Sequence, residues 1–449
     1  MSDHPLGYKL FGDKFSTPEM RAIFTEASYI QALLDVEGAL ATAQGRLGVI
    51  PAGAAATIAA AARVERMDLD AIAADSRNRA HYLVAVVRAL EQASGGEAGQ
   101  YVHYGTTTQD IIDTATVLLL RRALGPMARD LGRVEAALAG LAERYKATPM
   151  AGRTHAVHAL PITFGLKAAV WLAEAARHRQ RLEQLKARLL VGNITGAVGT
   201  FAGFGPQGFA VQAETLRALG LGVPEICWHA ARDRFAEFVS WEALTASSLA
   251  KIANEVRSLM KTEVGELEEP VPPGAVGSST MPQKRNPNLC EDTLALAKIV
   301  RGHAHAMLEA VEVEHERDAG AWRMEFVVLP ESCLLFSAAL RNAARILEGL
   351  VVHEDRMARN LDLTGGLIMA EAVMFALGEH IGKQRAHDVV YECAMTAQQS
   401  GRPFAEVLAA DRTVGQHLTG DEIARLLDPR AHLGLSVEAV EQVLKGRKA

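Results

Sequence analysis

One segment of the sequence, residues 277–287, combines hydroxyl, amide and ammonium groups with two prolines. It reads Gly-Ser-Ser-Thr-Met-Pro-Gln-Lys-Arg-Asn-Pro. The prolines limit the conformations of the chain, and a polar loop of this kind can close over an anionic substrate and exclude water. The same composition is also typical of a surface turn. The residues alone therefore leave a substrate-closing loop and a surface turn as alternatives.

A second segment, residues 152–161, places His155 and His158 three residues apart in Gly-Arg-Thr-His-Ala-Val-His-Ala-Leu-Pro. Two histidines at this spacing could bind a metal or titrate during catalysis. They could equally be histidines at the start of a helix whose ring nitrogens bond to the backbone. Because the segment has no glutamate in a His-Glu-x-x-His arrangement, the sequence does not predict zinc.

A third segment, residues 101–110, ends in Thr106, Thr107, Thr108, Gln109 and Asp110 before a helix that opens at Ile111. Threonine and aspartate at the start of a helix are ordinary caps. The free N–H groups of an uncapped helix start would instead bind an anion. Both interpretations remain open from the residues alone.

Other polar residues stand beside apolar helices or in charged clusters. His81 precedes an apolar helix over 83–90, where a single histidine is usually structural. The runs Arg232-Asp233-Arg234 and His315-Glu316-Arg317 could each be solvated ion pairs. These residues acquire a predicted role only from a wider resemblance.

The composition of the 449 residues excludes several classes of function. Lys and Arg number 47 against 53 Asp and Glu, which gives a net charge of −6 and argues against a binder of nucleic acid. The four cysteines form no Cys-x-x-Cys pair, which excludes a disulfide scaffold and a cysteine-spaced zinc site and fits the reducing cytoplasm. We see no secretory signal and no membrane-length apolar stretch. The sequence predicts a soluble cytoplasmic protein without nucleic-acid or membrane partners.

Hydrophobic periodicity near 3.6 residues dominates the chain and predicts an all-α fold. Helices are expected over 30–45, 128–146, 236–267, 288–317 and 330–352. Helices of this length indicate an extended bundle, and no segment shows convincing strand alternation. The interruptions predict three parts: 1–104, a central bundle over 105–350 with a functional loop over 268–287, and 351–449.

The segment over 277–287 resembles the signature of the fumarase/aspartase superfamily, and the likeness extends over nearly the whole chain. It is strongest to the branch of adenylosuccinate lyase and 3-carboxy-cis,cis-muconate cycloisomerase. The resemblance implies an all-helical, three-domain subunit with a central bundle of long helices. It also implies a homotetramer in which residues from three subunits form each active site, with no cofactor and no metal.

The resemblance also implies roles for individual residues. Ser278 is the base that takes a proton from the carbon beside a carboxylate, and the resemblance pairs His155 with Glu291 and makes His155 or His81 the acid. The residues implied to bind substrate are Thr107, Thr108, Met281, Lys284, Asn286, Arg232, Arg234 and Arg317. A carbanion beside a carboxylate delocalises into a dianion, which positive charge and helix N-termini stabilise.

One stretch, residues 319–326, departs from adenylosuccinate lyases. Phe326 stands where the phosphate-binding arginine would be and Trp322 replaces a hydroxyl, although Arg323 could supply the charge. The stretch is similar to carboxymuconate cycloisomerases, but His155 is retained, which their bacterial form commonly lacks.

We therefore expect a lyase acting on a small dicarboxylate or tricarboxylate. It would cleave a C–N bond, or second a C–O bond, in a succinyl-type substrate by anti β-elimination and release fumarate or a related acid. The alternative is lactonisation of a carboxymuconate. Adenylosuccinate lyase itself and a non-catalytic structural relative rank below these.

Overall fold

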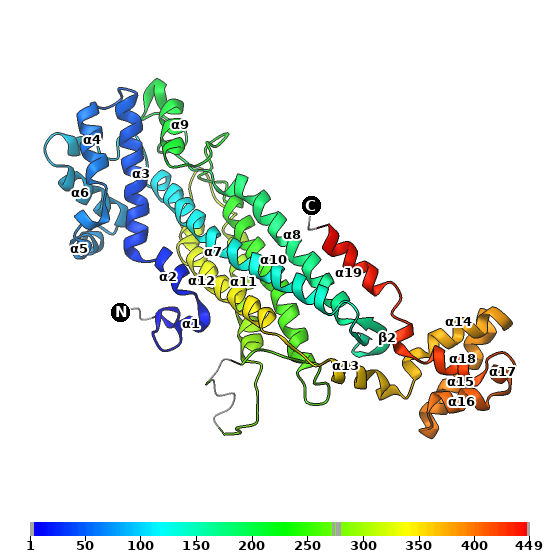
Figure 1. The fold of residues 1–449 in the computed structure, drawn as a ribbon. Coiled ribbons are helices and arrows are strands. Elements are labelled where there is room, and N and C mark those ends of the chain that lie inside the picture. The colour runs from blue at the N-terminus through cyan, green and yellow to red at the C-terminus, as the bar shows by residue number, and fades with distance from the viewer. Residues whose placement is uncertain (1–3, 272–273, 275–279, 447–449) are drawn as a thin grey trace. The chain divides into compact units, whose positions relative to one another are not determined.

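The computed structural model describes residues 4–271, 274 and 280–446, and Figure 1 follows their helices and strands along the chain. The α-helices are α1 (Gly12–Phe15), α2 (Pro18–Ile23), α3 (Glu26–Arg46), α4 (Ala52–Ala61), α5 (Leu69–Arg79), α6 (Tyr82–Ser94), α7 (Thr108–Arg144), α8 (Phe164–Leu189), α9 (Gly208–Ala218), α10 (Asp233–Leu259), α11 (Asn288–Glu309), α12 (Ala319–Glu348), α13 (Glu354–Leu361), α14 (Ala370–Ile381), α15 (Lys383–Ser400), α16 (Phe404–Ala410), α17 (Arg412–Gly415), α18 (Gly420–Leu426) and α19 (Ser436–Lys445). Short 3-10 helices are η1 (Pro5–Gly7), η2 (Val64–Arg66), η3 (Ala98–Tyr101), η4 (Gly205–Gln207), η5 (Asp362–Thr364), η6 (Leu367–Met369) and η7 (Pro429–Ala431). The strands are β1 (Pro149–Thr154), β2 (Val157–Thr163), β3 (Leu267–Glu268) and β4 (Val351–Val352), paired antiparallel as β1–β2 and β3–β4. The prediction of an all-α fold is confirmed, with only small sheets beside the helices.

The long helices differ from the predicted ones at their ends. α10 ends at Leu259 rather than at 267, and the carbonyl of Leu259 accepts the N–H of Glu266 after the chain turns at Gly265, whose φ is +62°. α11 ends at Glu309 rather than at 317, where a run of glutamates opposes the negative end of the helix dipole. α12 begins at Ala319, well before Pro330, because Asp318 accepts the N–H of Gly320 and caps the helix start.

The segment with the two histidines forms a β-hairpin, which the sequence did not predict. Thr154 pairs with Val157, so His155 and Ala156 form a two-residue turn. Both have positive φ, +51° and +69°, as a hairpin turn that matches the twist of its strands requires. His155 therefore lies at a hairpin tip and not at the start of a helix, because the turn geometry overrides the apolar pattern on either side.

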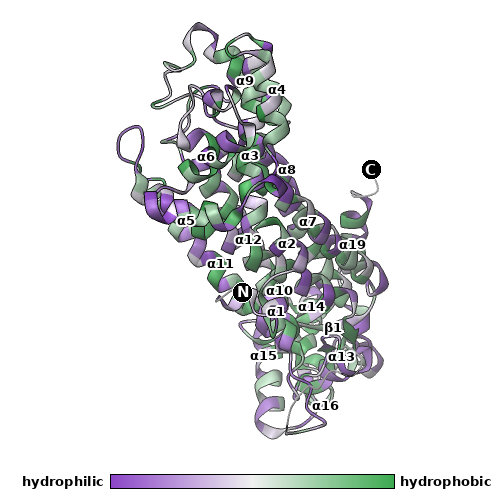
Figure 2. Cartoon of the chain, turned by 90° about the vertical axis from the view of Figure 1, so that its left-hand side faces the viewer, coloured by the Kyte–Doolittle hydropathy of each residue, from purple (hydrophilic) through white to green (hydrophobic). Residues whose placement is uncertain are grey.

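The chain divides into two compact units. The first unit comprises Met1–Gly132, Arg177–Lys251 and Asp292–Asn342, and the second comprises Arg133–Ala176, Ile252–Glu291 and Ala343–Ala449. In the first unit, α3 is largely hydrophobic and buried while α5 is mostly hydrophilic, with only Ile72 buried (Figure 2). In the second unit, α14 to α18 enclose an apolar core that includes Leu377, Phe404 and Leu408. The three-part division stays a prediction.

No single helix among the described residues has the length and hydropathy to cross a membrane. One pair of helices, Glu354–Thr364 with Leu367–Ile381, meets both criteria together and is bent by 81°.

A carboxylic acid is buried among the helices of the first unit. Glu242 is fully buried on α10, and the Ser332 hydroxyl of α12 donates to its Oε2. Its Oε1 has no hydrogen-bond partner among the described residues. Burial raises the pKa of Glu242 to about 8, against 4.5 for an ordinary glutamate, so the group is mostly protonated at neutral pH.

The raised pKa makes stability depend on pH. Because the folded state holds this proton more tightly than the unfolded state, the stabilisation is complete below pH 4.5 and is lost as pH rises through about 8. The free energy of unfolding of the wild type should therefore fall on the order of a few kcal/mol between pH 5 and pH 9. Glu242→Gln keeps the shape of the side chain but cannot ionise, so we expect this fall to be absent from the variant. Thermal unfolding of wild type and variant from pH 5 to pH 9 measures this. Parallel pH curves for the two proteins would contradict it.

Candidate active site

The N-terminus of α7 is fixed by one buried carboxylate, that of Asp110. Its Oδ2 accepts the N–H of Thr107 at 3.2 Å and that of Gly196 at 2.8 Å. Its Oδ1 accepts the N–H of Thr195 at 3.0 Å. Asp110, in the first turn of α7, thus accepts the N–H of the residue just before the helix and also holds the segment 195–196 beside it.

Two of the residues predicted to bind substrate meet at this helix start. Nη2 of Arg317 lies 3.3 Å from Oγ1 of Thr107 and donates to the carbonyl of Ala197 at 2.7 Å. Arg317 is exposed, and Thr108 is the first residue of α7. A guanidinium, a hydroxyl and a helix N-terminus together form a donor-rich position for a carboxylate.

Arg232 lies deeper, with an exposed fraction of 1%. Its Nε and Nη2 donate to Glu325, its Nη1 and Nη2 donate to Asp113 at 2.8 and 2.9 Å, and Nη1 also donates to the carbonyl of His229 at 3.3 Å. All five N–H groups are therefore used inside the protein. The guanidinium thus has no free N–H group among the described residues and joins the elements around it, and the expectation that Arg232 binds substrate stays a prediction.

Arg234 lies apart from this cluster. Its Nη1 donates to the carbonyl of Arg188 near the end of α8, and its guanidinium carbon is 5.8 Å from the centre of the Trp228 ring. The structure thus does not bring Arg234 to Thr107, although Arg317 does reach that position. The two arginines of the Arg-Asp-Arg run at the start of α10 therefore bond to different elements, and the sequence alone could not reveal this.

A second buried ion pair joins the same two segments as the pair of Arg232 and Asp113, and it was not predicted from the sequence. Nε2 of His229 lies 2.9 Å from Oδ1 of Asp110, and both side chains are buried. Burial opposes the charge on the imidazole, but the bond to Asp110 outweighs it and raises the His229 pKa to about 9. The available signal was a matched spacing: Asp110 and Asp113 are three residues apart on α7, and His229 and Arg232 are three residues apart in the segment before α10.

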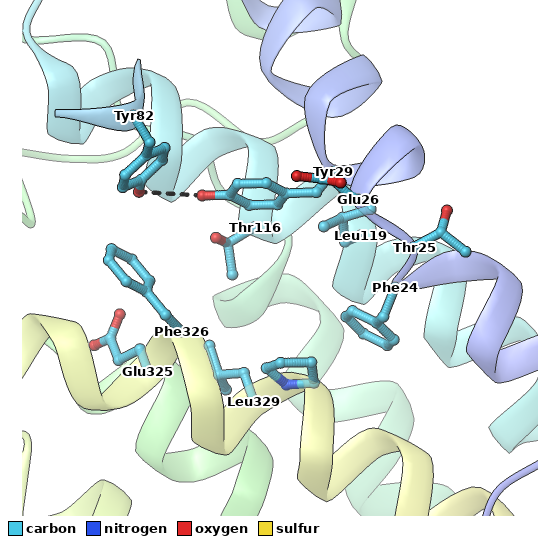
Figure 3. A pocket seen from close by; sticks show the side chains of 11 residues that line it. Phe24, Thr25, Glu26, Tyr29, Tyr82, Thr116, Leu119, Glu325, Phe326 and Leu329 are labelled. Atoms are coloured by element: carbon cyan, nitrogen blue, oxygen red, sulfur yellow. Dashed lines mark hydrogen bonds between the residues drawn. The ribbon is translucent and has the colours of Figure 1, made fainter. Parts of the chain in front are cut away.

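His81 stands beside a cavity of the first unit. Its Nδ1 accepts the N–H of Val84 at 3.4 Å and caps α6, while the ring remains exposed. The next residue, Tyr82, lines a cavity of about 330 Å³. Figure 3 shows its hydroxyl bonded to that of Tyr29, at 3.2 Å, with Phe326 nearby. The lining residues are Phe24, Thr25, Glu26, Tyr29, Tyr82, Thr116, Leu119, Glu325, Phe326, Leu329 and Pro330.

In the second unit, an ion pair anchors the hairpin that carries His155. Nη2 and Nη1 of Arg153 donate to Glu266 at 2.6 and 3.0 Å, and Asn360 Nδ2 donates to the same carboxylate at 2.7 Å. Glu266 is fully buried. The base of the hairpin is therefore fixed, and His155 projects from its tip with an exposed side chain.

The signature loop leads into α11, whose start is capped by a buried carboxylate. Glu269 accepts the N–H groups of Leu289 and Cys290 at 3.0 and 2.9 Å. Glu291 follows in the first turn of α11 and is exposed. The cap fixes the direction in which the chain leaves the loop and enters the helix.

Three further predicted residues of the loop lie before α11. Met281 and Lys284 are exposed, Met281 with an exposed fraction of 44%, and Asn286 is half-buried. The N–H of Lys284 bonds to the carbonyl of Met281 at 3.1 Å. Ser278 lies outside the described residues.

The predicted pair of His155 and Glu291 is not joined within one chain. Both residues are described, and no hydrogen bond or ion pair connects them. Among the described residues, no group of three or more His, Cys, Asp or Glu side chains could hold a metal ion. The chain alone thus assembles a carboxylate position at α7 and an apolar cavity, while His155, Lys284 and Glu291 remain exposed.

Two family models match the chain. The model described as "Lyase" matches residues 13–302, and the one described as "Adenylosuccinate lyase C-terminus" matches residues 366–443. An N-acetyl-S-(2-succino)cysteine lyase from Dickeya dadantii is 46% identical over 99% of this chain and 98% of its own length. A 3-carboxy-cis,cis-muconate cycloisomerase from Pseudomonas aeruginosa is 44% identical over 99% of this chain and 97% of its own length.

Solved structures agree in fold. A fumarate lyase from Mesorhizobium sp. BNC1 matches with a TM-score of 0.91 and 44% identity, over 96% of this chain and 99% of that one. A 3-carboxy-cis,cis-muconate lactonizing enzyme from Pseudomonas putida matches with a TM-score of 0.92 and 40% identity, over 98% of this chain and 99% of that one.

The position of Arg232 leads to a stability prediction. Arg232→Met leaves the buried carboxylates of Asp113 and Glu325 without their partner, which we expect to cost about 3–5 kcal/mol. Arg234→Met is the matched control, because this half-buried arginine touches no buried carboxylate of the described residues, and its cost should stay below about 1 kcal/mol. Denaturant unfolding of both variants measures the difference, and equal losses would contradict the assignment.

Proposed function

Because this chain belongs to the fumarase/aspartase superfamily, we propose that it is a lyase that eliminates a thiol from a 2-succino thioether and releases fumarate. The reaction is a reversible anti β-elimination that breaks a C–S bond. From the sequence alone, we expected cleavage of a C–N bond, with cleavage of a C–O bond as the second alternative. The sulfur assignment rests on the reaction named for two relatives, each 46% identical over 99% of this chain.

The observation that carries the proposal is the cavity beside His81. Its described lining residues include neither lysine nor arginine, and Arg323 is not among them. One lining carboxylate, Glu325, is already bound by Arg232. A nucleotide phosphate would find no cation here, whereas a leaving group without phosphate fits an aromatic and apolar wall. The cavity therefore favours a thiol leaving group over a nucleotide.

In the proposed mechanism, different residues act on the two carboxylates and on the sulfur of the substrate. Ser278 takes the proton from the carbon beside one carboxylate, and Lys284 and Asn286 stabilise the dianion that forms. Thr107, Thr108 and Arg317 hold a carboxylate at the start of α7. The C–S bond then breaks, and His155 or His81 protonates the leaving thiolate. Since a thiol has a pKa of about 8.5, its thiolate leaves with less help from an acid than an amine needs.

The exposure of the predicted catalytic residues supports a shared site. His81, His155, Lys284 and Glu291 are all exposed on the single chain. A site that excludes water needs these side chains covered, and another copy of the chain can cover them. We place each site between subunits of a cytoplasmic homotetramer, in which His155 of one subunit meets Glu291 of another.

A cycloisomerase that closes a carboxymuconate to a lactone is the second candidate. It is favoured by the 44% identity over 99% of the chain to the enzyme from Pseudomonas aeruginosa. The same base and carboxylate position would serve an intramolecular addition, so only the substrate distinguishes the two candidates.

A substrate panel tests the proposal. The panel contains an S-(2-succino) thioether, a succinyl amine and a carboxymuconate, and fumarate is followed by its ultraviolet absorbance. We expect fumarate from the thioether, with kcat reduced by about 10²-fold or more in Ser278→Ala. Ser279→Ala is the matched control and should retain most activity. Consumption of the carboxymuconate alone would establish the second candidate, and full turnover by Ser278→Ala would refute the base assignment.

Mixed oligomers test the shared site. Ser278→Ala and His155→Ala should each be inactive alone. If the two residues come from different subunits, co-expressed mixtures contain some sites with both residues intact and regain measurable activity. Ser278→Ala with Lys284→Ala is the control, because both residues belong to one loop of one chain and cannot complement each other. Mixed oligomers that are isolated by two tags and remain inactive would contradict the arrangement.

A further inference from the structure

The apolar cavity of the first unit lies farther along the same two helices as the carboxylate position. Thr107 and Arg317 meet where α7 and α12 begin. Nine residues farther along the chain from each of them, Thr116 and Phe326 line the cavity. At a rise of about 1.5 Å per residue, nine residues of helix correspond to roughly 13 Å. A succinyl group is shorter than this, so only the part of a substrate beyond its sulfur can reach the cavity.

Contacts between these two levels show that α7 and α12 run in the same direction. Nε1 of Trp322 donates to Oδ1 of Asp113 at 3.1 Å, and Arg232 binds both Asp113 and Glu325. All of these residues belong to the first unit. The separation between the carboxylate position and the cavity is therefore fixed by buried polar contacts.

Aromatic rings connect the predicted acid His81 to the cavity. The ring centroids of His81 and Tyr82 are 6.5 Å apart. Those of Tyr82 and Phe326 are 6.0 Å apart in an edge-to-face arrangement, and Phe326 packs in turn on Trp322 at 5.2 Å. A leaving group that takes a proton from His81 therefore has the aromatic wall of Tyr82 and Phe326 beside it.

The polar part of the cavity is a pair of neutral hydroxyls. The hydroxyls of Tyr29 and Tyr82 are bonded to each other at 3.2 Å, as Figure 3 shows, and neither has another hydrogen-bond partner among the described residues. Burial raises the pKa of both phenols, to about 12 for Tyr29, so both keep their protons. Because one hydroxyl donates to the other, a single O–H remains to donate to a ligand. A neutral acceptor such as an amide carbonyl satisfies this donor.

The charges at the cavity oppose an anionic ligand. Its described lining residues include two carboxylates, Glu26 and Glu325, and neither lysine nor arginine. Arg232 already binds Glu325 from the interior. Most of the remaining wall is apolar, as at Phe24 and Leu329. A neutral group with an apolar end therefore fits, and a volume of about 330 Å³ has room for a short chain.

We propose that the cavity binds an amide-linked acyl chain on the leaving thiol, with Phe326 as a specificity-determining residue. This inference rests on the proposed elimination from a 2-succino thioether and names the class of thiol that is released. The amide carbonyl accepts the free O–H of the Tyr29–Tyr82 pair, and the acyl chain packs on Phe326. The preferred substrates are S-(2-succino) derivatives of N-acylated cysteines, and the preference rises with the length of the acyl chain until the cavity is full.

A series of S-(2-succino)cysteines that carry a free amine, an N-acetyl, an N-butanoyl or an N-succinyl group tests this selection. The butanoyl and succinyl chains have equal length, but the succinyl chain ends in a carboxylate. We expect KM to fall on the order of tenfold from N-acetyl to N-butanoyl, because two more methylene groups are buried, with kcat changed less than about twofold. N-succinyl should bind no better than N-acetyl. An equal KM for all members, or the lowest KM for the free amine or N-succinyl, would overturn the proposal.

A change of charge at one residue tests the role of Phe326. Phe326→Arg places a cation in the cavity, so we expect this variant to prefer N-succinyl over N-butanoyl, the reverse of the wild-type order. Val327→Arg is the matched control, because Val327 has an exposed fraction of 57% and does not line the cavity. An unchanged order in Phe326→Arg, or a reversed order in both variants, would overturn the assignment. If circular dichroism shows that Phe326→Arg does not fold, Phe326→Ala replaces it and must lose the gain from the longer chain.

Binding of the product thiols separates this inference from the proposed elimination. Calorimetry with N-acetylcysteine and N-butanoylcysteine needs no turnover, and we expect the longer thiol to bind on the order of tenfold more tightly. If no thioether is cleaved but the longer thiol binds more tightly, the proposed function fails and the assignment of the cavity stands. If thioethers are cleaved but the two thiols bind equally, the assignment of the cavity fails alone.

Discussion

Two parallel ion pairs between α7 and the segment before α10 organise the first unit of this protein. Asp110 binds His229 and Asp113 binds Arg232, and the two aspartates are one turn apart on α7. Arg232 also binds Glu325 of α12, and Trp322 of α12 donates to Asp113 at 3.1 Å. A buried guanidinium is tolerated only when its donors are all satisfied. These ion pairs thus hold together α7, the segment before α10, and α12, which are far apart in the sequence. The carboxylate position and the apolar cavity both lie on elements that this network joins.

The sequence predicted the helical class because the long apolar stripes required helices. The family followed from the residue-by-residue resemblance of the loop over 277–287, and the chemistry of that loop stays a prediction. The hairpin at His155 was missed because its turn depends on two non-glycine residues in left-handed conformations, which no propensity favours. The start of α12 was missed because the Asp318 cap begins the helix well before Pro330, which the helix then contains.

For the site residues too, the sequence shows the residue type but not the position in the folded chain. Arg232, Arg234 and Arg317 are all arginines in charged runs, and their different partners cannot be told from the sequence alone. The structure separates them by their partners: Arg232 is fully bonded in the interior, Arg234 reaches a carbonyl of α8, and Arg317 contacts Thr107. Only tertiary contacts reveal such differences, since a guanidinium on a long side chain can reach several elements from one backbone position.

The pairing of Asp110 with His229 also changes the electrostatic potential at the start of α7. A carboxylate at a helix start caps the N–H groups, but its negative charge would repel the substrate carboxylate proposed to bind there. His229 carries a positive charge at neutral pH because its pKa is about 9, and it lies on the same carboxylate. The pair is then nearly neutral, so the helix dipole and Arg317 determine the local potential. The cost of this arrangement is a charged imidazole that is almost completely buried, and its bond to Asp110 offsets the desolvation of that charge.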